Sequence, residues 1–120
     1  MALPEIEASR SLLFEAVAAV VTATDGLSSD QLNWRPAPES NSLLILATHV
    51  IGAVEESVLT SLCRARPSER DRDAEFRAAG DSASQLSERW QALRSEIEAA
   101  LDGLSRADLE VVYRHPRRGR

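Results

Sequence analysis

The sequence contains no lysine, and all 14 of its basic residues are arginine. Together with the abundant alanine, this indicates a GC-rich bacterial genome, which is an inference about codon usage alone. Because Cys63 is the single cysteine, an internal disulfide bond is excluded. The first residues lack a basic leader with a long apolar core, and uninterrupted apolar runs fall far short of the ~20 residues of a membrane span. We therefore predict a cytoplasmic protein without a membrane partner.

The composition is that of a soluble globular domain. Of the 120 residues, 43% are hydrophobic and 28% are charged, which predicts one domain over residues 1–120. The net charge of -5 argues against nucleic acid as a partner of the whole domain. The basic run 114–120 is more typical of a solvated tail than of a binding patch.

Three apolar periodicities predict an all-α fold with long helices near residues 5–24, 41–62 and 82–102 and no substantial sheet. Ser28 and Ser82 each begin a capping-box pattern, and Ser40 or Asn41 is expected to cap the second long helix after its proline-containing turn. A further short helix is predicted over residues 73–79, with Phe76 as its core anchor. Trp34 and Trp90 are interpreted as core or loop anchors.

A pattern G-L-S-x-x-x-L occurs twice, at an offset of 77 residues. Each copy follows a helix of about 20 residues, which favours an internal pseudo-repeat. The first copy leads through a proline turn into the second long helix. By analogy, Pro116 supplies the second turn and a fourth helix opens near residue 117, so that the counterpart of His49 falls near position 126, beyond Arg120.

The segment 33–56 carries the motifs most informative about function. It holds the order W-R-P and then T-H-V-x-G-x-x-E, at Trp34 to Pro36 and Thr48 to Glu55. With the preceding G-L-S-x-x-x-L and the later pair Glu75-Phe76, this order resembles the DinB-like superfamily over nearly the whole chain. The pair and the segment that follows are similar to a branch called DUF664 or mini-circle proteins.

The resemblance implies an up-down four-helix bundle that holds a divalent metal of the zinc, nickel or iron type with three histidines. One ligand maps to His49, and the other two belong to an H-x-x-x-H on a last helix, which is missing from these 120 residues. The domain is therefore expected to be C-terminally incomplete and to bind metal weakly on its own. Relatives with known activity imply a thiol-dependent transferase or isomerase that uses a mycothiol-type cofactor and a small-molecule substrate.

Other interpretations of the polar residues stay open beside this one. From its position at the edge of an apolar arc, His49 is more often a surface or edge histidine than a ligand. Glu55 or Glu56 is a candidate for orienting His49, and His115 is interpreted as a solvent-exposed residue in a basic loop. Cys63 beside arginines could be mildly reactive, but a buried structural thiol is favoured.

Two classes of function follow. The first is a metal- and thiol-dependent enzyme with His49 as a metal ligand. The alternative is a non-catalytic helical module without a working metal site, which acts by association. Because a bundle that lacks one helix leaves apolar surface exposed, we also predict a homodimer.

Overall fold

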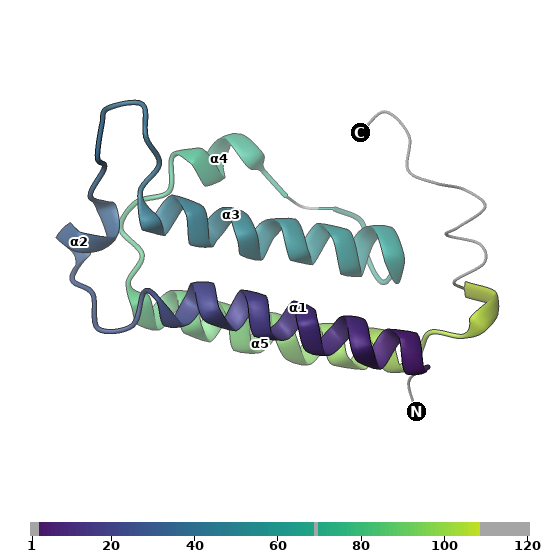
Figure 1. The fold of residues 1–120 in the computed structure, drawn as a ribbon. Coiled ribbons are helices and arrows are strands. Elements are labelled where there is room, and N and C mark those ends of the chain that lie inside the picture. Colours follow the sequence, from purple (N-terminus) through teal and green to yellow (C-terminus); the bar gives the residue numbers. More distant parts are fainter. Residues whose placement is uncertain (1–2, 69, 109–120) are drawn as a thin grey trace.

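The computed structural model describes residues 3–68 and 70–108, which form a bundle of three long helices with short helices at its edges (Figure 1). The long elements are α1 (Pro4–Thr22), α3 (Leu43–Glu55) with its continuation η1 (Glu56–Leu62), and α5 (Ala83–Asp102). The short helices are α2 (Ser29–Asn33) and α4 (Arg72–Phe76). These described ranges contain no strand, so the all-α prediction and its three long helices are confirmed.

The direction of α5 is set by the long connection 63–82, which carries the chain and α4 back along α3 (Figure 1). As a result α5 runs antiparallel to α1 and parallel to α3. An ion pair of 3.5 Å joins Arg10, near the start of α1, to Asp102 at the end of α5. Among the long helices, α1 is therefore antiparallel to both α3 and α5, whereas α3 and α5 run in the same direction.

The continuation η1 is a π-helical turn, in which backbone bonds span five residues, as from Cys63 N to Val58 O at 2.8 Å. Such a turn adds a residue to the helical repeat and changes which side chains face inward. Here it buries Val58 and Leu59 in succession. The helix thus keeps contact with the core up to its end.

Serine side chains begin most of the helices. Ser28 and Ser82 form the two predicted capping boxes with Gln31 and Gln85. The prediction for α3 was wrong by one or two residues, because Ser42 rather than Ser40 or Asn41 is the cap. Its hydroxyl accepts a hydrogen bond from Ile45 N at 3.1 Å.

The two G-L-S copies have similar local structures. In both, the leucine packs on the core and the serine caps the next helical turn; Ser105 Oγ accepts from Asp108 N at 3.2 Å. The glycines differ: Gly26, after the end of α1, has φ +75, whereas Gly103 has φ -85. The predicted fourth helix near residue 117 lies outside the described residues.

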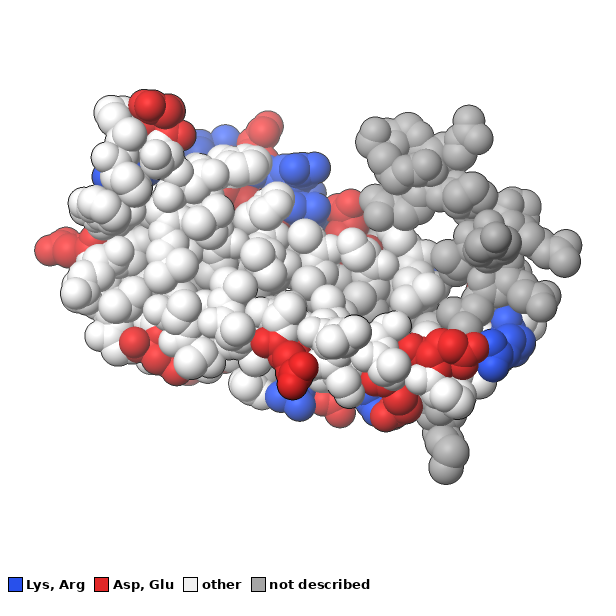
Figure 2. All heavy atoms as spheres, viewed as in Figure 1, with Lys and Arg blue, Asp and Glu red and all other residues white. Residues whose placement is uncertain are grey.

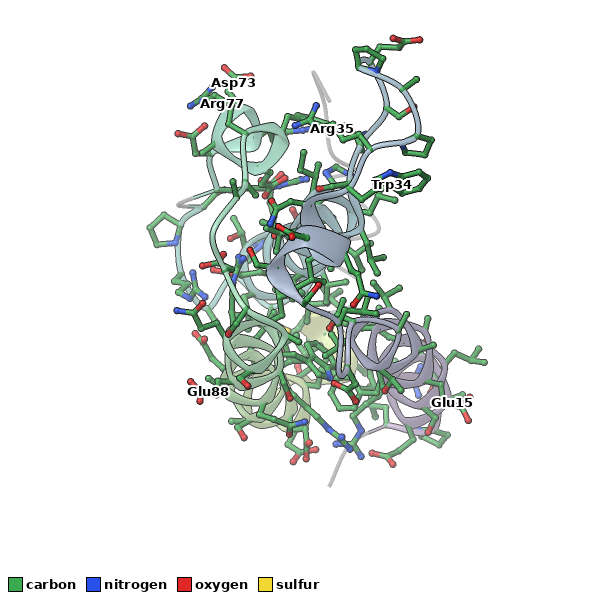
Figure 3. All side chains as sticks on the ribbon, turned by 90° about the vertical axis from the view of Figure 1, so that its left-hand side faces the viewer. Glu15, Trp34, Arg35, Asp73, Arg77 and Glu88 are labelled. Carbon is green, nitrogen blue, oxygen red and sulfur yellow. The ribbon has the colours of Figure 1, made fainter. Side chains whose placement is uncertain are left out.

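One of the three predicted aromatic anchors is in the core. Trp90 is fully buried and meets Phe14 edge-to-face, with ring centroids 5.6 Å apart. The prediction was wrong for Trp34, which is 66% exposed and points away from the bundle (Figure 3). It was also wrong for Phe76, which is 43% exposed, because α4 turns its neighbour Glu75 inward instead.

The outer side of α1 and α3 forms a broad surface without charged side chains, with acidic and basic residues along its rim (Figure 2). The apolar residues that these helices leave partly or largely exposed include Leu13, Val20, Leu46, Val50 and Val54. We call this surface the uncharged face. Its composition follows from the sequence, since α1 carries no charge after Glu15 and α3 none before Glu55.

The continuous segment Leu43–Leu62 is long and apolar enough to cross a membrane by length and composition. In the bundle, 44% of its apolar window is buried against the other helices. The core helix of a soluble protein has the same length and composition, so this segment is weak evidence for a membrane span. The cytoplasmic location stays a prediction.

Candidate functional site

The predicted site residue His49 lies on α3, on the side that faces α4. Its side chain is 32% accessible, and its polar contacts are made with side chains rather than with the backbone. The predicted position of His49 at the edge of the apolar arc is therefore confirmed. Whether the ring binds a metal stays a prediction.

Two charged side chains meet at Nδ1 of His49. Glu75 Oε1 lies 3.2 Å from this nitrogen, and Arg70 Nη2 lies 3.1 Å from it. Arg70 also donates two hydrogen bonds to the carboxylate, from Nε to Oε2 at 2.9 Å and from Nη2 to Oε1 at 3.0 Å. Arg70 and Glu75 therefore form a bidentate ion pair that lies beside the imidazole of His49.

Glu75 is buried and Arg70 is partly buried, with side-chain accessibilities of 7% and 10%. Burial raises the pKa of Glu75, but the hydrogen bonds and charge of Arg70, with a smaller contribution from His49, leave this pKa below its ordinary value. The same bonds raise the pKa of Arg70. Glu75 is therefore an ionised carboxylate in the interior, and its charge is compensated there.

Gly52 makes room for this arrangement. A β-carbon at residue 52 would overlap Glu75 Oε2 and lie 3.0 Å from Glu75 Cδ. Glycine in a helix interior costs about 1 kcal/mol relative to alanine, so its presence in α3 calls for such a packing reason. The close approach of Glu75 to the α3 backbone supplies that reason.

The one-turn helix α4 presents both of its last side chains to His49. Asp71 caps the turn by accepting a hydrogen bond from Ala74 N at 3.0 Å. Glu75 then reaches Nδ1, and the Phe76 ring lies beside the imidazole with centroids 5.7 Å apart and planes tilted by 32°. Polar and aromatic contacts from α4 thus restrain the ring of His49 together.

A cavity of about 320 Å3 opens beside the ion pair, between α3, α4 and the start of α5. Thr48, Gly52, Arg70, Glu75 and Arg89 contribute to its lining. The hydroxyl of Thr48 is buried and has no hydrogen-bond partner among the described residues. A polar group in this cavity could satisfy it.

Glu55 and Glu56, which were predicted as candidates for orienting His49, contact other residues instead. Glu55 accepts a hydrogen bond from Arg66 Nη2 at 2.7 Å, and Arg66 Nε also donates to Glu96 at 2.8 Å, which ties α3 to α5. Glu56 accepts from Ser68 at 3.1 Å. Since α3 and η1 turn these two glutamates toward α5 and the connection, the carboxylate that contacts His49 is Glu75.

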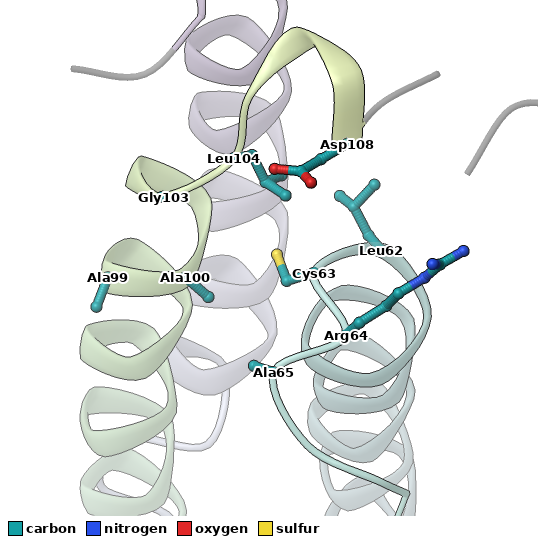
Figure 4. A pocket seen from close by; sticks show the side chains of 9 residues that line it. All are labelled: Leu62, Cys63, Arg64, Ala65, Ala99, Ala100, Gly103, Leu104 and Asp108. Carbon is teal, nitrogen blue, oxygen red and sulfur yellow. The ribbon is translucent and has the colours of Figure 1, made fainter. Parts of the chain in front are cut away.

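Cys63 lies at the end of η1, beside a second cavity of about 260 Å3 that Leu104 and Asp108 help to line (Figure 4). The thiol is half-buried, and burial, with a smaller effect of the Asp108 charge, raises its pKa. A raised pKa disfavours the reactive thiolate. This geometry supports the structural interpretation of Cys63.

The side chains present fit one ligand of a metal site rather than a complete one. Within residues 3–68 and 70–108, no three His, Cys, Asp or Glu side chains come together in a way that could hold a metal ion. Glu75 lies beside His49, and Arg70 already pairs with that carboxylate. His115 lies outside the described residues.

Sequence reasoning found His49 but missed Arg70, Glu75 as its partner, and the role of Gly52. The available signal was the glycine in the middle of an apolar helix, which indicates a close approach by another group. Nothing in the charged connection 64–73 distinguished Arg70 from its neighbouring arginines. The contact depends on how α4 folds back over α3.

The fold and this cluster define an all-α bundle domain with one part-exposed histidine held by a buried ion pair. A sequence profile of the DinB superfamily matches residues 12–120, so the chain belongs to that superfamily. This confirms the family resemblance, whereas the mini-circle branch stays a prediction. Searches among curated proteins and solved structures gave no significant match.

Proposed function

We propose that this DinB-superfamily domain uses Nε2 of His49 as one ligand of a divalent metal ion of the zinc, nickel or iron type. The observation that carries this proposal is the geometry of His49, whose Nδ1 meets the ion pair while the ring stays 32% accessible. Further ligands must come from outside the described residues, because these do not bring three together. Binding by one such chain is therefore expected to be weak.

The chemistry implied by the family belongs to the same proposal. A divalent metal with an open position lowers the pKa of a bound thiol or water and so provides a nucleophile near neutral pH. Transfer or isomerisation with a mycothiol-type thiol and a small-molecule substrate is supported by the family membership. The cavity beside Arg70 and Thr48 offers space for part of such a substrate.

The test is a zinc titration of the 120-residue chain, followed by NMR of the histidine rings. His49 signals are expected to move in the wild type and in His115→Ala, the matched control. In His49→Ala, zinc-dependent changes should be lost. Equal zinc uptake by wild type and His49→Ala would contradict the proposal.

A second candidate function, association without a metal site, is supported by the uncharged face. The net charge of -5 makes two copies repel each other, and this face is where they can approach without opposing like charges. An apolar cavity of about 290 Å3 between α1 and η1, lined in part by Ile6, Leu13 and Leu62, continues this surface. The proposed occupant is a second copy of the chain.

A further inference from the structure

We propose that Glu75 is a positioning residue that fixes the His49 imidazole with its proton on Nδ1 and so leaves the lone pair of Nε2 for a ligand. What binds at Nε2 rests on the proposed function above. The assignment of the proton rests only on the arrangement of His49, Arg70 and Glu75.

The donor and acceptor chemistry selects between two arrangements of the proton. A guanidinium can only donate hydrogen bonds, and an ionised carboxylate can only accept them. If Nδ1 accepted from Arg70, its lone pair would face Glu75 Oε1 at 3.2 Å without a hydrogen between them. If Nδ1 carries the proton, it donates to Oε1.

The second arrangement gives each lone pair of Glu75 Oε1 a donor. Oε1 then accepts two hydrogen bonds, from Nδ1 and from Arg70 Nη2 at 3.0 Å, which matches its two lone pairs. The 3.1 Å between Nη2 and Nδ1 follows because two donors converge on the same oxygen. The proton therefore belongs on Nδ1.

The carboxylate is held firmly enough to impose this choice. Arg70 donates a hydrogen bond to each oxygen of the Glu75 carboxylate, and the backbone at Gly52 lies against Oε2. The Phe76 ring, with its centroid 5.7 Å from that of the imidazole, limits rotation of the imidazole. A histidine that donates one ring N–H to a carboxylate has its tautomer and orientation fixed for ligation through the other nitrogen.

A purely structural role for Glu75 would leave the histidine proton unaffected. In that case the ion pair would only hold α4 on α3, and the imidazole would distribute its proton between both nitrogens. The tautomer of His49 therefore distinguishes positioning from structural support. Thermal unfolding alone does not, because both roles predict a loss of stability when the pair is removed.

The experiment is long-range proton–nitrogen NMR of the His49 ring near neutral pH, with His115→Gln in all samples so that one histidine remains. The wild-type ring should show a protonated Nδ1 and an unprotonated Nε2. The variant Arg70→Leu with Glu75→Leu removes the acceptor without leaving a buried charge unpaired. In it, the Nε2–H form should appear. Glu88→Gln, which changes an exposed carboxylate on α5, should match the wild type.

Zinc is then added to the same samples. Because the loss of such a partner lowers metal affinity roughly 10–100-fold, the double variant should bind zinc weaker by about this factor. An Nε2–H tautomer in the wild type, or an unchanged tautomer in the double variant, would overturn the positioning role. If the tautomers behave as expected but zinc leaves Nε2 unaffected, positioning stands and the proposed metal-ligand function fails.

Discussion

The carboxylate of Glu75 occupies the space that a β-carbon on residue 52 would require, so the absence of a side chain at Gly52 and the inward turn of Glu75 depend on each other. These residues lie in different helices, α3 and α4. Their contact brings the buried ion pair to His49. Stability and the geometry of the site are therefore linked at this one position.

Gly52→Ala is expected to destabilise the fold by up to about 2 kcal/mol. The new methyl group must displace the Glu75 carboxylate, and overpacking typically costs about 1–3 kcal/mol, while alanine recovers about 1 kcal/mol of helix propensity. The measurement is urea unfolding. Gly103→Ala is the control, since a β-carbon there would meet its nearest atom at 3.6 Å. A Gly52→Ala protein more stable than the wild type would show that Glu75 moves aside without cost.

The stability provided by Glu75 should depend on pH. Its pKa in the folded state is lowered, so its contribution is complete above the unfolded value of about 4.3 and disappears as the pH falls through the lower folded value. Glu75→Gln should therefore be less stable than the wild type near neutral pH, and the difference should shrink below about pH 4.3. Urea unfolding at several pH values measures this. The control is Glu88→Gln, on the exposed side of α5. A difference that stays constant into acid would contradict the expected charge pairing.

The helices could be predicted from the sequence because their periodicities and capping signals are local. The capping boxes of Ser28 and Ser82 and the left-handed Gly26 depend only on residues within one turn. Trp34 and Phe76 were misplaced because hydrophobicity does not tell which side of a loop or a one-turn helix faces the core. Both residues are largely exposed.

The site was only partly predictable for a related reason. His49 stood out through the family motif and its place on the helix. Its partner lies 26 positions later, and the contact forms because the connection returns along α3. A glutamate in a charged stretch normally indicates a solvated surface, so the burial of Glu75 requires the tertiary fold to be known.

Arg66 should stabilise the bundle by joining α3 to α5. Its guanidinium contacts Glu55 and Glu96, and its bond to Glu96 lowers the pKa of that carboxyl. The groups are part-exposed, so Arg66→Ala should cost only about 1 kcal/mol, and less at high salt. Urea unfolding at low and high salt checks this against Arg77→Ala, which changes an exposed arginine directly after α4 (Figure 3). If Arg66→Ala and Arg77→Ala had the same small effect on stability at low salt, Arg66 would not stabilise the bundle by joining α3 to α5.

The uncharged face should mediate association of the 120-residue chain. Leu46 is 46% exposed on it, among partly exposed side chains that include Val50 and Val54. Covering this surface with a second copy removes apolar area from water at ~25 cal/mol per Å2, against the entropic cost of joining two chains. Sedimentation at micromolar concentration should therefore show a dimer.

Leu46→Glu should shift that equilibrium to monomers. In an isologous interface the same surface of each chain is in contact, so both chains would place a new carboxylate in it. The expected loss of affinity is at least tenfold, corresponding to the few kcal/mol that burial of an uncompensated charge costs. Ala92→Glu adds the same charge to an exposed position on α5 and should leave the dimer intact. Circular dichroism of both variants confirms that the helices persist. A wild type that remains monomeric, or two variants that dissociate equally, would exclude the uncharged face as the dimer interface.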